Sequence, residues 1–271
     1  MARYRVGCSG WSYEDWVGVF YPAGVAAGEF LERYARVFDV TEVDSSFYRP
    51  PTEFLTRRWA SVTPKGFLFA LKIPREITHE PLTAELPDRV RHFLSVLRPL
   101  REEGKLGPLV AQFPPSFRRS NGATRLEQLL AEIPPEYELA VELRHNSWWV
   151  PETFSALEAR GAALVWSVFP GVRNTYRQTG DFLYARFIGD RALTRFDRIQ
   201  RDGRVDMEGM KAHFEQEGGS ARTVLSFVNY HFMGFGRGTA RILQGVLGVP
   251  PADLSRAGTE PGQRGLEEFG E

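Results

Sequence analysis

Short apolar segments recur along the whole chain, and helical patterns separate most of them. Eight such segments occupy residues 4–8, 40–44, 67–72, 109–113, 139–143, 163–167, 182–187 and 224–228. Several of them are almost continuously apolar, which is typical of parallel strands that are covered on both faces. The pattern therefore predicts an α/β protein built around a parallel sheet.

The segments between the predicted strands carry the period of amphipathic helices. Apolar side chains fall on one helical face over residues 90–100 and again over residues 126–133. Pro151 stands where a first helical turn begins, and Gly161 stands where that helix ends. The chain is therefore expected to alternate strands with helices.

This alternation, over a chain of 271 residues, matches the (β/α)8 TIM barrel. The competing arrangement is an open doubly wound sheet, which usually carries a glycine fingerprint after its first strand. Residues 7–10 lack that spacing. We therefore predict a single TIM barrel over residues 1–250, followed by a flexible, polar and glycine-rich tail over residues 251–271.

The charges of the chain balance, with 34 basic and 34 acidic residues. A chain with balanced charge has no strong overall field, which weakens the case for a membrane partner or a nucleic-acid partner. We expect no membrane partner, whereas nucleic acid stays possible because a neutral protein can carry a basic patch. Cys8 is the single cysteine, so an internal disulfide and a CxxC site are both excluded. The chain starts with no charged-then-apolar leader and has no apolar run of membrane-spanning length. We expect a soluble, cytoplasmic protein.

Polar and charged residues gather where the predicted strands end. In a TIM barrel the carboxyl ends of the strands form one rim, and active sites lie there. We therefore expect the side chains at these ends to share one pocket. The candidate site residues are Trp11, Glu42, Asp44, Lys72, His79, Gln112, Glu142, Arg144, His145, Arg186 and Asn229.

Period-two alternation indicates the direction of two of these side chains. Residues 139, 141 and 143 are apolar and share one strand face, so Glu142 and Arg144 share the other. If the apolar face packs on helices, Glu142 and Arg144 point into the mouth of the barrel. By the same alternation, Lys72 shares a strand face with Ala70, opposite the face of Phe69 and Leu71.

Two interpretations account for this convergence of charge. A Glu and an Arg that lie close together neutralise each other, and this purely structural role remains open for Glu142 and Arg144. However, burial costs several kcal/mol per ion, and stability does not reliably repay that cost. So many charges at one rim are therefore more easily explained by a polar ligand.

The leading hypothesis is an enzyme acting on a small anionic ligand, sugar- or phosphate-containing, by acid/base chemistry. Glu142 is predicted to be the acid–base carboxylate, assisted by Asp44 or His145. Lys72 is either a cation that binds the anion or a base or imine-forming amine. Arg144 and Arg186 are predicted to bind the negative charge of the ligand, and Gln112 and Asn229 to orient it. Trp11 is predicted to form part of the pocket wall, and Glu42 and His79 are further ligand-binding candidates.

A divalent metal cofactor remains open. Ligands of the right type exist, namely Glu42, Asp44, His79, Glu142, His145 and His231. Their spacing matches no HExxH or HxH motif, and the P-loop and nucleophile-elbow signatures are also absent from the sequence. Sequence motifs therefore assign no metal.

A series of short motifs runs in order through the chain. They are Gly7-Cys8-Ser9-Gly10-Trp11, Phe20-Tyr21-Pro22, Glu42-Val43-Asp44-Ser45-Ser46-Phe47-Tyr48, the segment 67–72, Ile77-Thr78-His79, the segment 112–117, Ala140-Val141-Glu142-Leu143-Arg144-His145, Trp148, Arg186-Phe187-Ile188-Gly189, and Asn229-Tyr230-His231 with Gly234. Together they resemble the YecE-like family, also called domain of unknown function 72, over residues 6–247. The resemblance implies a TIM barrel whose biochemical role is unassigned.

Two positions depart from the pattern of that family. Many members carry His where this chain has Ile188, and a second Asn where it has Tyr230.

Two further hypotheses stay open beside the leading one. One is a metal-dependent phosphodiesterase on damaged nucleic acid, by analogy with apurinic endonucleases. The other is a non-catalytic binding or scaffold protein, which these departures favour. The oligomeric state is left open.

Overall fold

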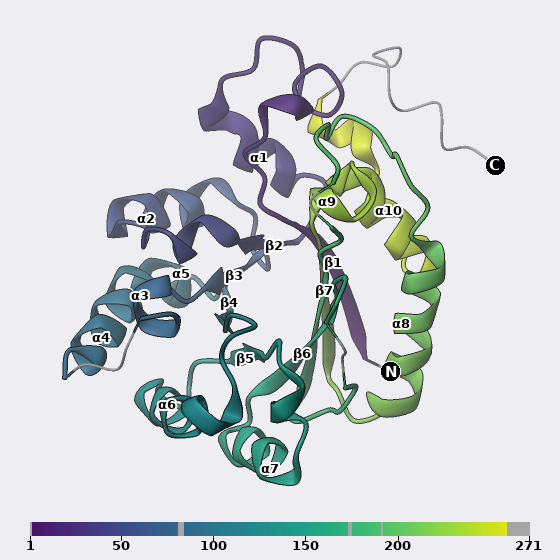
Figure 1. The fold of residues 1–271 in the computed structure, drawn as a ribbon. Helices are drawn as coiled ribbons and strands as arrows, with labels where there is room; N and C mark the ends of the chain where they lie inside the picture. The colour runs from purple at the N-terminus through teal and green to yellow at the C-terminus, as the bar shows by residue number, and fades with distance from the viewer. Residues whose placement is uncertain (1, 81–83, 173–174, 191, 259–271) are drawn as a thin grey trace.

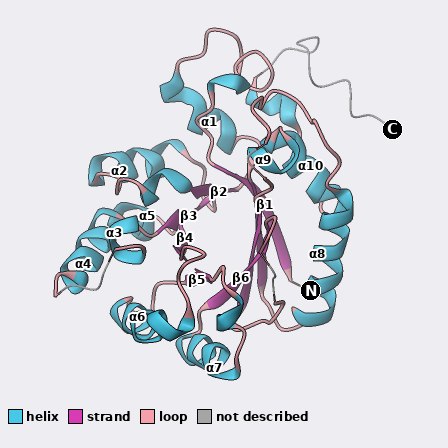
Figure 2. Ribbon diagram, in the orientation of Figure 1, coloured by secondary structure: helices cyan, strands magenta, loops and turns pink. Residues whose placement is uncertain are grey.

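Eight parallel strands close into a barrel in the computed structural model of this chain (Figures 1 and 2). The structure describes residues 2–80, 84–172, 175–190 and 192–258. The predicted TIM barrel is confirmed, and each predicted strand overlaps an observed one. The strands are β1 (Arg3–Ser9), β2 (Val40–Val43), β3 (Leu68–Lys72), β4 (Leu106–Gln112), β5 (Leu139–Glu142), β6 (Ala163–Val168), β7 (Phe182–Phe187) and β8 (Thr223–Val228).

Helices surround the barrel, as Figure 1 shows. They are α1 (Phe30–Ala35), α2 (Glu53–Val62), α3 (Arg75–Thr78), α4 (Leu86–Val96), α5 (Arg98–Glu102), α6 (Arg119–Glu132), α7 (Pro151–Arg160), α8 (Arg204–Glu217), α9 (Tyr230–Met233) and α10 (Gly236–Val246). The described residues between β6 and β7 include no helix. None of the described helices is both long enough and apolar enough to cross a bilayer.

One predicted helical segment is divided in two. The apolar face over residues 90–100 belongs partly to α4 and partly to α5. Pro99 lies in the first turn of α5, where its missing amide hydrogen is tolerated, whereas in a helix interior it removes a hydrogen bond. The two helices therefore meet near Leu97, which is fully buried.

The barrel closes where β1 pairs with both β2 and β8. Cys8 lies in register with Thr41 on one side and with Val228 on the other. Gly7 makes the first contact possible, because a Cβ atom there would lie 2.1 Å from the Val40 carbonyl oxygen. Closure leaves the sheet without an edge strand.

The two faces of each strand contribute to two different cores. Leu139 and Val141 pack in the outer core with residues of the helices, whereas Ala140 belongs to the inner core of the barrel. Glu142 follows Ala140 on the inward face. The predicted directions of the β5 side chains are thus confirmed, and Ala70 places Lys72 inward in the same way.

A polar layer lies above the inner core at the carboxyl ends of the strands. Seven inner-core residues, one on each strand from β2 to β8, are Val40, Ala70, Val110, Ala140, Val165, Tyr184 and Phe227. Two residues further along each strand the side chain is polar, at Glu42, Lys72, Gln112, Glu142, Ser167, Arg186 and Asn229. Because alternate residues share a strand face, these side chains form one layer.

Packed structure continues past the predicted domain boundary at residue 250. A 3₁₀ turn at Leu254–Ala257 buries both of its terminal residues. The Arg33 guanidinium of α1 donates to the Ala257 carbonyl oxygen over 3.3 Å. The last part of the predicted tail, residues 259–271, lies outside the described residues.

Candidate functional site

A cavity of about 680 Å³ opens at the carboxyl ends of the strands. Its wall combines cationic, polar and aromatic side chains, with Asp44 as the carboxylate among its lining residues. They are Tyr13, Asp44, Phe47, Tyr48, Lys72, Arg75, His79, Gln112, Arg144, Phe169, Arg186, Ile188, Gly189, Asn229, Tyr230 and His231. This set includes seven of the eleven site residues that the sequence predicts.

Arg186 lies at the centre of the polar layer. Its Nε and Nη2 donate to Glu42 Oε1 over 3.2 and 2.8 Å, and Nη2 also reaches Asp44 Oδ1 at 3.1 Å. Nη1 donates to Gln112 Oε1 over 3.2 Å and to Glu142 Oε2 over 2.6 Å. A guanidinium has five N–H donors, so these five contacts use all of them.

Glu42 is fully buried and holds three side chains together beneath the cavity. Its Oε1 accepts from Ser9 Oγ over 2.8 Å as well as from Arg186, and its Oε2 accepts from Tyr184 over 2.7 Å. Burial raises the pKa of Tyr184 well above its usual value, so this phenol remains a donor. Glu42 does not line the cavity.

Glu142 is also fully buried, between two arginines. Arg144 Nε donates to one carboxylate oxygen over 2.6 Å, and Arg186 donates to the other. Burial alone raises the pKa of Glu142, but the charges of Arg144, Arg186 and Lys72 outweigh that effect and lower the pKa to about 2. A carboxylate with so low a pKa is a weak base near neutral pH.

Lys72 presents its amine to the cavity from the end of β3. The residue is 7% exposed, and Nζ donates to Gln112 Oε1 over 2.8 Å. Asp44 Oδ1 lies 3.4 Å away, and the Phe47 ring lies 4.5 Å from Nζ. Burial lowers the pKa of Lys72, although the charge of Asp44 opposes that effect.

Asp44 is more exposed than Glu42 and Glu142, the two carboxylates of the polar layer. It begins the 3₁₀ turn Asp44–Phe47, which follows β2, and its side chain is 31% exposed. The side chains of Glu42 and Glu142 are at most 1% exposed. Asp44 is therefore the carboxylate that a molecule in the cavity meets first.

Arg144 offers hydrogen-bond donors that Arg186, with all five of its own occupied, does not. Its Nε is bound to Glu142, and its guanidinium lies over the Phe169 ring at 4.9 Å. Among the residues that the structure describes, none hydrogen-bonds to its two terminal nitrogens. A guanidinium fork in this state is suited to a carboxylate or phosphate group.

His79 faces the same cavity as a neutral imidazole. Burial lowers its pKa to about 4, and the charges of Lys72 and Arg125 act in the same direction. Its Nδ1 lies 2.9 Å from Thr78 Oγ1, and its ring packs edge-on against Phe47 at 4.8 Å.

Three predicted side chains have structural contacts of their own. His145 Nδ1 accepts from the Ser147 amide over 3.1 Å and caps a 3₁₀ turn, outside the cavity. Trp11 packs edge-on against Trp59 and also lies outside the cavity wall. Asn229 lines the cavity, and its side chain caps α9.

Tyr184, Arg75 and Phe169 belong to the site but are not among the residues predicted from the sequence. Tyr184 lies beneath the cavity, two residues before Arg186 on the same strand face, so the alternation of β7 contains the signal that would have found it. Arg75 and Phe169 line the cavity. Both follow the ends of strands, where no alternation indicates the direction of a side chain.

The described residues include no group of three or more His, Cys, Asp or Glu placed to hold a metal ion. Glu42 and Glu142 are instead bound to arginines. The predicted alternative of a metal site therefore has no set of ligands in the described part of the chain.

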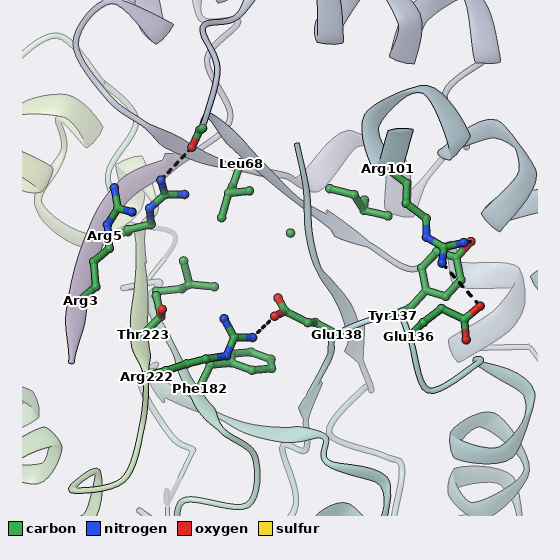
Figure 3. Close-up of a pocket in the computed structure, with 14 residues that line it drawn as sticks. Arg3, Arg5, Leu68, Arg101, Glu136, Tyr137, Glu138, Phe182, Arg222 and Thr223 are labelled. Atoms are coloured by element: carbon green, nitrogen blue, oxygen red, sulfur yellow. Dashed lines mark hydrogen bonds and ion pairs between the residues drawn. The ribbon is translucent and has the colours of Figure 1, made fainter. Parts of the chain in front are cut away.

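A second cavity, of about 470 Å³, lies at the opposite end of the barrel (Figure 3). Arg222 pairs there with Glu138, and Arg5 donates to the Gly66 carbonyl oxygen over 2.7 Å. Arg101 pairs with Glu136 at 3.7 Å. These cations are already matched by protein groups. In TIM barrels this end serves stability and the other end carries the chemistry, so the larger cavity is the candidate site.

Comparison with known proteins agrees with this fold. A family model described as "Protein of unknown function DUF72" matches residues 5–264. The chain belongs to the DUF72 family. The family resemblance that the motifs indicated is thereby confirmed, and the family description assigns no ligand or reaction.

Individual DUF72 relatives agree with the family model. UPF0759 protein YecE of Escherichia coli (strain K12) is 31% identical over 147 residues, which is 53% of this chain and 49% of YecE. UPF0759 protein YunF of Bacillus subtilis (strain 168) is 28% identical over 169 residues, 58% of this chain and 57% of YunF. The match thus spans about half the length of these relatives.

Solved DUF72 structures share the fold. A DUF72 family protein from Thermotoga maritima MSB8 superposes with a TM-score of 0.77 and 27% identity, covering 91% of this chain and 99% of that chain. Another from Enterococcus faecalis V583 has a TM-score of 0.75 and 20% identity, covering 92% of this chain and 99% of that chain.

The two positions at which this chain departs from the family pattern, Ile188 and Tyr230, both line the cavity.

Proposed function

We propose that the cavity at the carboxyl ends of the strands is the active site of an enzyme that acts on a small anionic ligand by acid/base chemistry. One observation carries the proposal. Asp44, Lys72 and Arg144 open into the cavity, while Glu42 and Glu142 are buried beneath it. A sugar- or phosphate-containing anion matches this arrangement.

The charge at the cavity wall favours an anion. Three carboxylates, Glu42, Asp44 and Glu142, balance the three cations Lys72, Arg144 and Arg186 at and beneath the cavity wall. Arg75 adds a further positive charge from α3. Arg144, with its terminal nitrogens directed to no described acceptor, and Arg75 are therefore the groups that bind the anion.

Lys72 and Asp44 form the acid/base pair in this proposal. The amine and the carboxylate oxygen are 3.4 Å apart at the cavity wall. Burial lowers the pKa of Lys72, so its ammonium gives up a proton more readily than an exposed lysine does. Glu142, predicted as the acid–base carboxylate, is better suited to position Arg144 because both of its oxygens are occupied.

Binding and turnover of small anions test the proposal. We expect glucose 6-phosphate, 3-phosphoglycerate or inorganic phosphate to bind, as measured by isothermal titration calorimetry. Arg144→Gln should weaken binding about tenfold, the loss expected for one charge-assisted hydrogen bond. The matched control is Arg101→Gln at the opposite end of the barrel, which should leave binding unchanged.

Two outcomes would contradict this proposal. The first is that none of the three anions binds, and the second is that both arginine substitutions weaken binding equally. Mass spectrometry of the incubated ligand then follows turnover. Binding without conversion would assign the protein a non-catalytic binding role.

A further inference from the structure

We propose that Lys72 forms an imine with its substrate, so that the substrates are small anionic aldehydes or ketones. This inference rests on the proposed function, because it requires that the cavity binds a small anion. It adds the chemical class of the reacting group, a carbonyl carbon, and assigns the covalent step to Lys72.

The surroundings of Nζ favour a nucleophilic amine. Its one hydrogen bond within the described residues goes to a neutral amide oxygen, Gln112 Oε1, at 2.8 Å. The nearest carboxylate oxygen, on Asp44, is 3.4 Å away, which is beyond the length of a good charge-assisted hydrogen bond. The Phe47 ring packs beside Nζ, and the open side of the amine faces the cavity.

The other buried lysine of the chain provides a contrast. Lys105 is 5% exposed, and its Nζ donates to the carbonyl oxygens of Ala60 and Thr63 near the end of α2. Those two bonds fix the amine against the backbone. Lys72 has no such double anchor, although both lysines are buried residues.

The charges around Lys72 act in both directions. Burial is the largest influence and lowers its pKa, and the positive charge of Arg186 acts the same way. Asp44, Glu42 and Glu142 act in the opposite direction. The net effect is a lowered pKa, which increases the fraction of neutral amine available to attack a carbonyl.

The covalent step balances with the groups present. Asp44 takes a proton from the Lys72 ammonium, and the neutral amine adds to the carbonyl carbon. A nitrogen–carbon bond forms while the carbonyl π pair moves to oxygen, which receives a proton from the nitrogen. Asp44 then returns its proton to this hydroxyl, the carbon–oxygen bond breaks and water leaves. The nitrogen lone pair completes the C=N bond of the iminium.

Trapping of the iminium with borohydride tests the inference directly. Pyridoxal 5′-phosphate is a suitable probe because it combines an aldehyde with a phosphate group. The chain has only four lysines, Lys65, Lys72, Lys105 and Lys211, so peptide mapping assigns each modified site. At limiting probe we expect Lys72 to be modified several-fold faster than exposed Lys65, because burial lowers the pKa of Lys72 and its amine lines the cavity that binds the phosphate group.

Three variants separate the possible causes. Lys72→Arg keeps the charge but forms no imine, so it should abolish trapping at this site while phosphate binding persists. Asp44→Asn should slow trapping at Lys72, and Lys65→Arg should leave it unchanged. Inorganic phosphate should compete with the probe for Lys72 but not for Lys65.

The results also distinguish this inference from the proposed function. If Lys72 is modified no faster than Lys65, or if phosphate does not protect it, the imine proposal is wrong. Phosphate binding that depends on Arg144, without trapping at Lys72, would overturn the imine alone. If phosphate binding does not depend on Arg144 and Lys72 is not trapped either, the proposed function is overturned as well.

Discussion

A single guanidinium, that of Arg186, joins side chains from opposite sides of the barrel. It belongs to β7, and its acceptors belong to β2, β4 and β5 and to the turn after β2. Such a buried charge is tolerated only when its partners are present, because an unpaired ion in the interior costs several kcal/mol. Its immediate role is therefore to hold the carboxylates of the layer in place.

Removing one of these partners should destabilise the protein strongly. We predict that Glu42→Gln lowers the free energy of unfolding by about 3–5 kcal/mol, because the charge of Arg186 is then undercompensated in a buried setting. Urea denaturation measures the change. Glu127→Gln on the exposed face of α6 is the control, and it should change stability little. A loss below about 1 kcal/mol for Glu42→Gln would mean that water compensates the arginine.

At the scale of elements, α10 buries a second arginine with different surroundings. Arg237 is fully buried between the rings of Phe20 and Phe235, at 4.9 and 4.1 Å. None of its guanidinium nitrogens has a hydrogen-bond partner in the described part of the chain. Burial lowers its pKa to about 9. The helix therefore packs against the barrel with a cation that costs stability.

An apolar side chain of similar length should improve this packing. We predict that Arg237→Met raises the free energy of unfolding at pH 7 by about 1–3 kcal/mol. The gain should shrink above pH 9, because the folded wild type then loses its proton while the unfolded chain keeps it up to its ordinary pKa. Denaturation of both proteins between pH 7 and 10 measures this. A gap that stays constant with pH would contradict the assignment.

The contact between β1 and β2 depends on the absence of a side chain at Gly7. We predict that Gly7→Ala lowers the unfolding free energy by about 2 kcal/mol or more, because its Cβ would lie 2.1 Å from the Val40 carbonyl oxygen. Gly209 in α8 is the matched control, since a Cβ there meets nothing within 4 Å. Gly209→Ala should stabilise by about 0.5–1 kcal/mol. Equal effects of the two substitutions would refute this account.

Elements with a regular period could be predicted from the sequence. The strands and the inward direction of Glu142 and Lys72 follow from alternation within one segment. Which charges pair with one another depends on closure of the ring, as the contact between Arg186 and Glu42 shows, and no local pattern contains that information. His145 lies in a loop, where no period indicates the direction of a side chain.

At the scale of the whole molecule, the barrel includes chain beyond its last long helix. The 3₁₀ turn at Leu254–Ala257 packs near α1 and buries Leu254. We predict that a chain ending at residue 250 is less stable than one ending at residue 258 by about 2–3 kcal/mol, the value of one buried leucine with its contacts. Thermal unfolding of the two truncated proteins measures the difference. Equal midpoints would show that this turn adds nothing.

The five occupied donors of Arg186 also bear on how relatives of this protein diverge. The Arg186 guanidinium connects strands on opposite sides of the barrel through hydrogen bonds. We therefore expect the polar layer that forms the floor of the cavity to be a rigid frame that tolerates few substitutions. Ile188 and Tyr230 line the cavity wall above that frame and lie outside the set of side chains that bind Arg186. Selectivity among ligands is therefore expected to change through the loops, while the braced floor is inherited unaltered.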